Sequence, residues 1–223
     1  MESVIDLFRV IYEPAAVFER VREKRKFLLP FIAFSIIAII LGFLMAPYRQ
    51  AATASQLAAA AQANPNVAAA AGKIAMFSML AAPVGVLVIV AIGASILWVL
   101  VSLVGGEANW RTLACMEFYV GISTILYQIV VFGMLAMSGV SSVHSTADLM
   151  PPLGLDLLAP HAGPSLTRLL GGINPFALWG VFLTAVGVEV TQKTSKGAAW
   201  TVAIISFVFS LGIGTLLAGL QLK

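Results

Sequence analysis

The chain has 223 residues, of which 60% are hydrophobic and only 10% charged, and its mean hydropathy is +0.99. A soluble fold needs about 25% charged residues to cover its surface, so this composition excludes an ordinary soluble domain and predicts a polytopic membrane protein. The formal net charge of +3 does not indicate nucleic-acid binding, and the single cysteine, Cys115, excludes an intramolecular disulfide.

Residues 1–26 form a segment that we expect to be cytoplasmic and to contain short amphipathic interfacial helices. Apolar residues share one face of the first helix: Val4, Leu7, Phe8 and Ile11. Pro14 can begin a second helix, whose apolar residues are Val17, Phe18 and Val21. Five acidic residues in this segment argue against a cleavable signal peptide, so the apolar run that follows is expected to be a retained anchor helix.

A basic cluster ends this segment directly before the first apolar run. Its members are Arg20, Arg22, Lys24, Arg25 and Lys26. Such a cluster predicts contact with anionic headgroups of the lipid bilayer or with a protein partner. The alternative interpretation is structural, with the segment packing as an anchor under the helical bundle.

Residues 27–223 contain five apolar runs that predict an all-α domain of five transmembrane helices. The expected spans are 27–48, 74–104, 112–138, 174–192 and 197–220. A hydrocarbon core about 30 Å thick needs roughly 20 residues of helix, which each run supplies. None shows the alternation of a membrane β-strand, and helices satisfy their backbone groups within the segment.

Two long loops between the spans differ in kind. Residues 51–72 are rich in alanine, which favours helical extensions of the flanking spans with a break at Pro65, although low-complexity disorder is the alternative. Residues 139–165 are rich in proline and glycine and predict an irregular loop. Two histidines and two carboxylates fall in this second loop, His144, Asp148, Asp156 and His161. Nothing in the sequence sets their geometry, so we predict no metal site and no cofactor.

The distribution of basic residues predicts the orientation. Nine of the thirteen Lys and Arg lie in residues 1–26 and in the turns 105–111 and 189–196. Because basic residues are retained on the cytoplasmic side, we expect a cytoplasmic N-terminus, both turns on that side, and the C-terminus on the far side.

Four charged residues near this cytoplasmic side are candidate functional residues: Glu107, Arg111, Glu117 and Glu189. Ionisable groups are costly in hydrocarbon, so Glu117, about two turns into the third span and seven residues after Trp110, is the strongest of them. The cluster could respond to protons or cations or dock a partner. The alternative is an interhelical ion pair, with Arg111 or Lys193 as the counter-charge.

The fifth span carries a stripe of small residues at four-residue spacing: Ser206, Ser210, Gly214 and Ala218. This spacing is typical of close helix–helix approach in lipid. The stripe therefore predicts either packing within the bundle or a homo-oligomer.

Several stretches along the chain resemble the Yip domain family, the membrane proteins named for interacting with Ypt/Rab GTPases. The stretches are Asp6-Leu7 with Pro14, Phe18, Arg22 and Leu28-Leu29-Pro30; Gly105 to Arg111; Asn174 to Trp179; Ala185-Val186-Gly187; and Ser195 to Ala198. The resemblance covers essentially the whole chain. It implies a five-span membrane fold, and the short N-terminus is similar to the prokaryotic branch.

The functional prediction is a non-enzymatic membrane scaffold or adaptor that meets a membrane or cytoplasmic protein partner at its cytoplasmic face. No H-E-x-x-H, G-x-S-x-G or Walker sequence is present. The alternative is a small transporter or channel. Transporter sites commonly lie at broken helices near the midplane, whereas the charges here lie near one interface.

Overall fold

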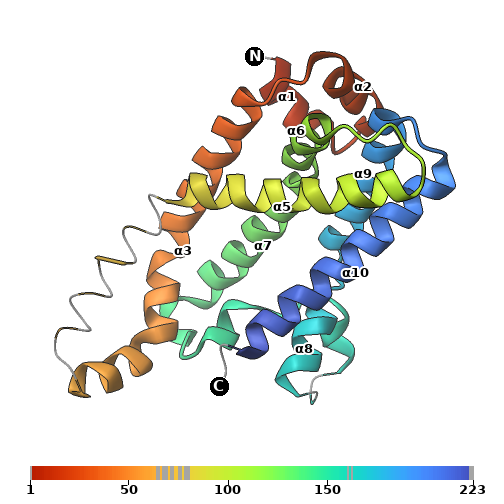
Figure 1. Cartoon of the computed structure of the whole chain (residues 1–223). Coiled ribbons are helices and arrows are strands. Elements are labelled where there is room, and N and C mark those ends of the chain that lie inside the picture. The colour runs from red at the N-terminus through yellow and green to blue at the C-terminus, as the bar shows by residue number, and fades with distance from the viewer. Residues whose placement is uncertain are drawn as a thin grey trace. The chain divides into compact units, whose positions relative to one another are not determined.

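The computed structural model describes residues 2–63, 66, 70, 73, 74, 77, 81–159, 161 and 163–220. Within these residues, the side chains of 2–4, 60, 61, 63, 164 and 216–220 are outside the description. All regular secondary structure in the described residues is helical (Figure 1). This confirms the predicted all-α class.

The chain contains nine α-helices and three 3₁₀ helices with given bounds in its described residues. In chain order they are α1 (Glu2–Arg9), α2 (Pro14–Lys24), α3 (Leu28–Ala63), α5 (Ala82–Leu103), α6 (Trp110–Val120), α7 (Ile122–Ser138), the 3₁₀ helices η1 (Val140–Ser142), η2 (Thr146–Leu149) and η3 (Leu155–Leu158), then α8 (Pro164–Gly171), α9 (Pro175–Gln192) and α10 (Lys196–Leu220). The chain divides into two compact units. Unit 1 comprises Met1–Ala33, Ile89–Thr124 and Pro152–Lys223, and unit 2 comprises Phe34–Val88 and Ile125–Pro151.

Five helical segments are long and apolar enough to cross a membrane, as predicted. They are Leu28–Ala59, Ala82–Leu103, Trp110–Ser138, Pro175–Gln192 and Lys196–Thr215. The third consists of α6 and α7, which are separated only by Gly121. The glycine keeps right-handed helical angles, and its N–H still donates to the Glu117 carbonyl at 2.9 Å, so the interruption is small.

Two of these segments extend the comparison with the predicted bounds. Helix α3 continues past residue 48 through the alanine-rich stretch to Ala63, which agrees with the helical extension expected there. The expected break at Pro65 lies outside the described residues. Helix α5 begins at Ala82, and Pro83 is its second residue, where the missing N–H costs no helical bond. The predicted start of this span at residue 74 falls in a stretch that is only partly within the described residues, so it stays a prediction.

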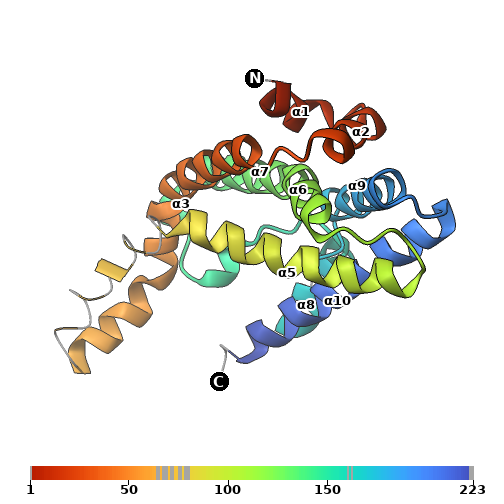
Figure 2. The same cartoon turned by 45° about the horizontal axis from the view of Figure 1, so that its top comes forward.

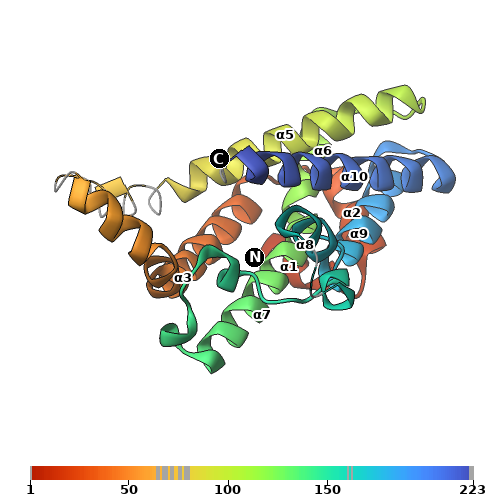
Figure 3. The same ribbon diagram turned by 90° about the horizontal axis from the view of Figure 1, so that it is seen from below.

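Unit 1 is built around α9. Helix α2 packs on α9 and α6, and α10 packs along α9. The predicted apolar face of α2, Val17, Phe18 and Val21, is buried in this contact. Figure 2 shows α1 beside α2, and Figure 3 shows α8 beside α10. In unit 2, α3 and α7 meet through Tyr48 and Phe132, whose rings form an edge contact with centroids 6.2 Å apart.

The apolar residues at the N-terminus differ in burial. Leu7 and Val10 are buried, at 1% and 0% exposure, but Phe8 is 56% exposed. Neighbouring helical positions are about 100° apart, so Phe8 points away from the side on which Leu7 is buried. The expected apolar face, which includes Leu7 and Phe8, is therefore only partly buried within the protein. Val4 lies among the side chains outside the description.

Candidate functional site

The turn between α5 and α6 is joined to the end of α9. The Glu107 N–H donates to the Gln192 backbone carbonyl at 3.0 Å, and the Asn109 N–H donates to Gln192 Oε1 at 2.7 Å. Gln192 is the last residue of α9, and Lys193 then adopts a left-handed conformation with φ 51°. Two turns more than 80 residues apart in the chain thus form one structure, which we call the turn junction (residues 105–111 and 189–196).

The Gln192 side chain is fully buried, and both ends of its amide are bonded. Its Oε1 accepts from Asn109 as described, and its Nε2 donates to Thr191 Oγ1 at 2.8 Å. Asn109 in turn caps α6, because its Oδ1 accepts from the Thr112 N–H and hydroxyl at 3.1 and 3.0 Å. A buried side-chain amide with a hydrogen-bond partner at each end holds the segments around it in one geometry. The sequence prediction did not include Gln192, and its only signal was an amide at the end of an apolar span.

The two glycines of the first turn have separate roles. Gly105 has φ +77°, a left-handed conformation that strains other residues. A Cβ on Gly106 would lie 2.5 Å from Thr194 Cγ2 and 2.7 Å from Val101 Cγ1, so this position admits only glycine at the observed spacing. The resemblance to a known family's glycine-rich turn therefore rests on residues that the junction needs.

A charge pair also joins the two turns. The Lys193 Nζ lies 3.0 Å from Glu107 Oε2, with both side chains well exposed. This is one of the two counter-charges considered in the structural alternative for the candidate cluster. Among the residues described, no hydrogen bond or ion pair links Glu107, Arg111, Glu117 and Glu189 to one another. Their joint action as a single site stays a prediction.

Glu117 lies on the face of α6 that meets α5. A Cβ on Gly93 of α5 would lie 3.1 Å from the Glu117 Cδ and Oε2, so the carboxylate packs directly against this glycine. One end of the same face carries Trp110, whose indole N–H donates to Ser95 Oγ at 3.0 Å. Trp110 and Glu117, seven residues apart, therefore both face α5, which agrees with the expectation that they share one face of their helix. Arg111 is exposed and Glu189 is half-buried.

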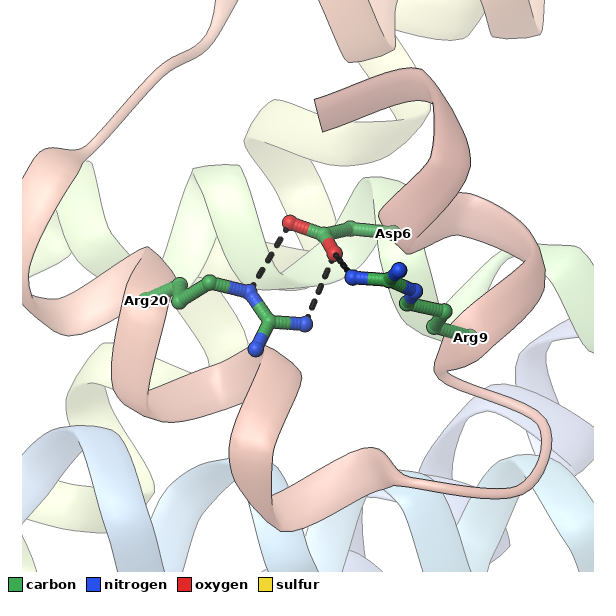
Figure 4. Close-up of polar contacts among 3 residues, drawn as sticks. All are labelled: Asp6, Arg9 and Arg20. Atoms are coloured by element: carbon green, nitrogen blue, oxygen red, sulfur yellow. Dashed lines mark hydrogen bonds and ion pairs between the residues drawn. The ribbon is translucent and has the colours of Figure 1, made fainter. Parts of the chain in front are cut away.

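A buried acidic residue joins α1 to α2. The Arg20 guanidinium donates to both carboxylate oxygens of Asp6, from Nε at 3.1 Å and from Nη2 at 2.7 Å (Figure 4). The Arg9 Nη1 lies 4.0 Å from Asp6 Oδ1. Two-point pairing of this kind gives orientation as well as energy. Arg20, predicted to face headgroups or a partner, therefore bonds inside the protein.

The basic cluster divides into internally bonded and exposed members. Arg22 donates from Nη1 to the Val190 carbonyl at 3.2 Å and pairs with Glu19 at 2.6 Å. The carbonyls at a helix C-terminus are unbonded within the helix and carry partial negative charge, so Arg22 is well placed at the end of α9. Three exposed members remain in the last residue of α2 and the link to α3: Lys24, Arg25 and Lys26.

The carboxylates of the proline-rich loop bond to nearby backbone. Asp148 Oδ2 accepts from the His144 N–H at 2.9 Å and the Ser145 N–H at 2.8 Å, and these bonds hold the pKa of Asp148 below its ordinary value. In the other unit, Asp156 accepts from the Gly154 N–H at 2.9 Å. In the described part of the chain, no group of three or more His, Cys, Asp or Glu side chains is placed to hold a metal.

The small-residue stripe of α10 is half-buried at Ser206 and exposed further along the helix. Ser210 and Gly214 are exposed, and a Cβ on Gly214 would meet no atom within 4 Å. The Ala218 side chain lies outside the described residues. A close contact of α9 with α6 and α2 is found instead at Gly187, where a Cβ would overlap Met116 Sδ and lie 3.3 Å from Phe18. Of the two alternatives for the stripe, packing within the bundle is not observed at Gly214.

The comparisons with known proteins agree with this geometry. A family model described as the Yip1 domain matches residues 8–218. A protein of Bacillus subtilis (strain 168) called membrane protein YknW is 27% identical over 216 residues, which cover 93% of this chain and 89% of that protein. No solved structure matches the chain.

Proposed function

The chain belongs to the Yip1 domain family of membrane proteins, and from this premise we propose that it is a non-enzymatic scaffold or adaptor. Its N-terminal helices and the turn junction together dock a protein partner. We call the surface formed by residues 2–26, 105–111 and 189–196 the terminal surface.

The observation that carries this proposal is the attachment of α2 to the end of α9. Val17, Phe18 and Val21 are buried there, and Arg22 bonds the last turn of α9. Three segments that are distant in the chain therefore form one ordered surface. Order before binding lowers the entropy cost of association, which favours a docking role.

The exposed charges of the terminal surface are of both signs. They are Arg9, Glu13, Glu23, Lys24, Arg25, Lys26, Glu107, Arg111, Lys193 and Lys196. Mixed charge on a surface selects a partner with the complementary pattern and steers its approach. The same distribution supports a cytoplasmic location for this surface, in a bacterial inner membrane, with the C-terminus on the far side.

Site-specific photo-crosslinking tests the docking role in the native membrane. A photo-reactive amino acid at Glu23 or Lys196 should give a discrete product with one protein partner, because both positions are exposed on the terminal surface. The matched control is Leu158, which is equally accessible in the proline-rich loop. Equal products from all three positions, or none from the first two, would count against the proposal.

The orientation has its own test. In a Cys115→Ala background, a membrane-impermeant maleimide added to intact cells should label Ser145→Cys in the proline-rich loop and leave Ala16→Cys of α2 unlabelled. Both positions are exposed. The opposite pattern would reverse the proposed topology.

The second candidate function is a small transporter or channel, and the observation that favours it is Glu117. This carboxylate lies within a candidate span, and the described residues supply it with no hydrogen bond or ion pair. Purified protein in liposomes discriminates the two functions. Robust solute or cation flux that is lost in Glu117→Gln, with folding retained, would replace the scaffold by a transporter.

A further inference from the structure

An apolar stripe is exposed on the outer face of α1. Ile5, Phe8 and Tyr12 are 49%, 56% and 67% exposed, and they follow one another at spacings of three and four residues. The backbone keeps helical turns through this stretch, since the Tyr12 N–H donates to the Arg9 carbonyl at 3.1 Å. The other face of α1 is occupied by Leu7 and Val10, which are buried. The stripe is thus a second apolar face, and packing among the described residues of unit 1 does not use it.

The position of α1 is set by its bonds to the helices around it. Asp6 is tied to Arg20 of α2 by two hydrogen bonds, and α1 also packs on α6. Helix α6 is the first part of the third candidate span. The exposed stripe therefore belongs to a helix that rests on the end of a membrane-crossing segment.

The chain length to the first span gives a limit on this distance. Four helical steps, from Arg20 to Lys24, and four further steps through the linking residues 25–27 connect Arg20 with Leu28, where α3 begins. At 1.5 Å and at most about 3.5 Å per step respectively, Arg20 lies within about 20 Å of the start of the candidate span. The exposed Lys24, Arg25 and Lys26 occupy the last part of this path, directly before that span.

The outer face of α2, opposite the buried Phe18, carries exposed acidic charge. Ala16 and Glu23 are exposed there, and Arg20 on the same side is paired with Asp6. Glu19 is half-buried and pairs with Arg22. The exposed basic residues are concentrated at the start of the first candidate span instead. An apolar stripe with an aromatic hydroxyl and a basic triad beside a candidate span are together typical of helices that lie on a bilayer.

We propose that α1 and α2 rest on an anionic bilayer surface. Ile5, Phe8 and Tyr12 insert at the boundary between headgroups and acyl chains, and Lys24, Arg25 and Lys26 bind lipid phosphates. This goes beyond partner docking, because it assigns a different ligand to the N-terminal helices and leaves the turn junction and the acidic face of α2 for a protein. The proposal does not depend on which leaflet of the bilayer these helices contact.

Depth measurements with spin labels test the insertion. The full chain, with Cys115→Ala, is labelled at Phe8→Cys and placed in nanodiscs of phosphatidylglycerol and phosphatidylcholine. The label at position 8 should be more accessible to oxygen than to a water-soluble nickel chelate. The matched control, Ala16→Cys, should show the reverse. Equal nickel accessibility at positions 8 and 16 would overturn the proposal and leave the stripe for a protein partner.

The basic triad is tested by replacing Lys24, Arg25 and Lys26 with glutamine in the Phe8-labelled protein. Each Lys or Arg near an anionic surface strengthens binding by roughly fivefold, so the triple variant should need several-fold more phosphatidylglycerol to reach the same label depth. Added salt should have the same effect on the unsubstituted triad. A depth that depends neither on phosphatidylglycerol nor on the triad would overturn the phosphate-binding part. Loss of the crosslinked partner with label depth unchanged would contradict only the proposed docking function.

Discussion

The N-terminal helix pair and the turn junction both attach to α9, but through different forces. The helix pair buries Leu7, Val10 and Phe18 and adds one paired carboxylate. The turn junction relies on backbone and amide hydrogen bonds centred on Gln192, with an exposed charge pair at its edge. Apolar burial supplies energy with little directional preference, whereas buried hydrogen bonds supply little net energy and specify one geometry.

This difference shows which parts of the terminal surface can vary. The helix pair should tolerate changes that conserve volume on its buried face, because hydrophobic packing of about the right size maintains a fold. The turn junction should tolerate few changes at its hydrogen-bonded positions, because each of these hydrogen bonds needs one specific donor and one specific acceptor. The four predictions that follow test this contrast, from the largest expected effect to the smallest.

The contact between α9, α6 and α2 should be the most sensitive to added volume. Gly187→Val places a side chain where Met116 Sδ and Phe18 already lie. Overpacking of this kind costs about 3 kcal/mol, so the midpoint of unfolding in detergent should fall clearly. Gly214→Val is the control, because its Cβ would meet no atom within 4 Å. Equal destabilisation by the two variants would show that α2 is not seated on α9 as described.

The side-chain amide of Gln192, at the centre of the turn junction, should have the next largest effect on stability. Gln192→Leu leaves the part-buried Asn109 N–H without its acceptor and removes the buried amide that Thr191 contacts, which together cost about 2 kcal/mol. Thermal unfolding of the purified protein measures the loss. The exposed Gln50→Leu provides a matched change with an expected effect below about 0.5 kcal/mol. A neutral Gln192→Leu would mean that apolar packing, and not hydrogen bonding, holds the two turns together.

The paired carboxylate of the helix pair should have a smaller and more local effect. Asp6→Asn weakens a two-point bond to Arg20, which is itself part-exposed, at a cost of about 1.5 kcal/mol. Hydrogen exchange in residues 2–12 should rise, while exchange in α9 stays the same. Glu19→Gln, which breaks an exposed pair, is the control and should change little. Faster exchange throughout unit 1 would contradict a local role.

The exposed pair of the turn junction should matter least. Glu107→Gln removes the partner of Lys193, but both side chains are well exposed, so the expected cost is below about 0.5 kcal/mol. The effect should disappear in high salt, where exposed charges are screened. Melting curves at two ionic strengths measure it. A large loss of stability that does not depend on salt would mean that this pair holds the turn junction together, as Gln192 is expected to do.

Most of the fold could be predicted from the chain because hydrocarbon imposes a simple rule on sequence. Runs of about 20 apolar residues must be helices, and five such runs predicted five candidate spans. The alanine-rich stretch also followed its local propensity, since α3 extends to Ala63 because alanine continues a helix beyond the apolar run.

The candidate site was less accessible to sequence reasoning, because its bonds join distant residues. Charge identified Glu107 and Glu117, but their partners are different elements: Lys193 for one, and the α5 helix at Gly93 for the other. Gln192 carries no charge and belongs to no motif, so its central position could not be recognised. The periodicity put Leu7 and Phe8 on one apolar face, and only the structure shows that Leu7 is buried and Phe8 exposed.

The sequence by itself determined that this protein is an all-helical membrane protein with a basic segment before its first span, because hydropathy and charge act residue by residue. The tertiary structure alone decided which members of that basic segment bond internally. Arg20 and Arg22 have partners in α1 and α9, whereas Lys24, Arg25 and Lys26 stay exposed beside the first span. Ion pairing depends on distance in space, and α1, α2 and α9 come within that distance only after their apolar faces have packed together.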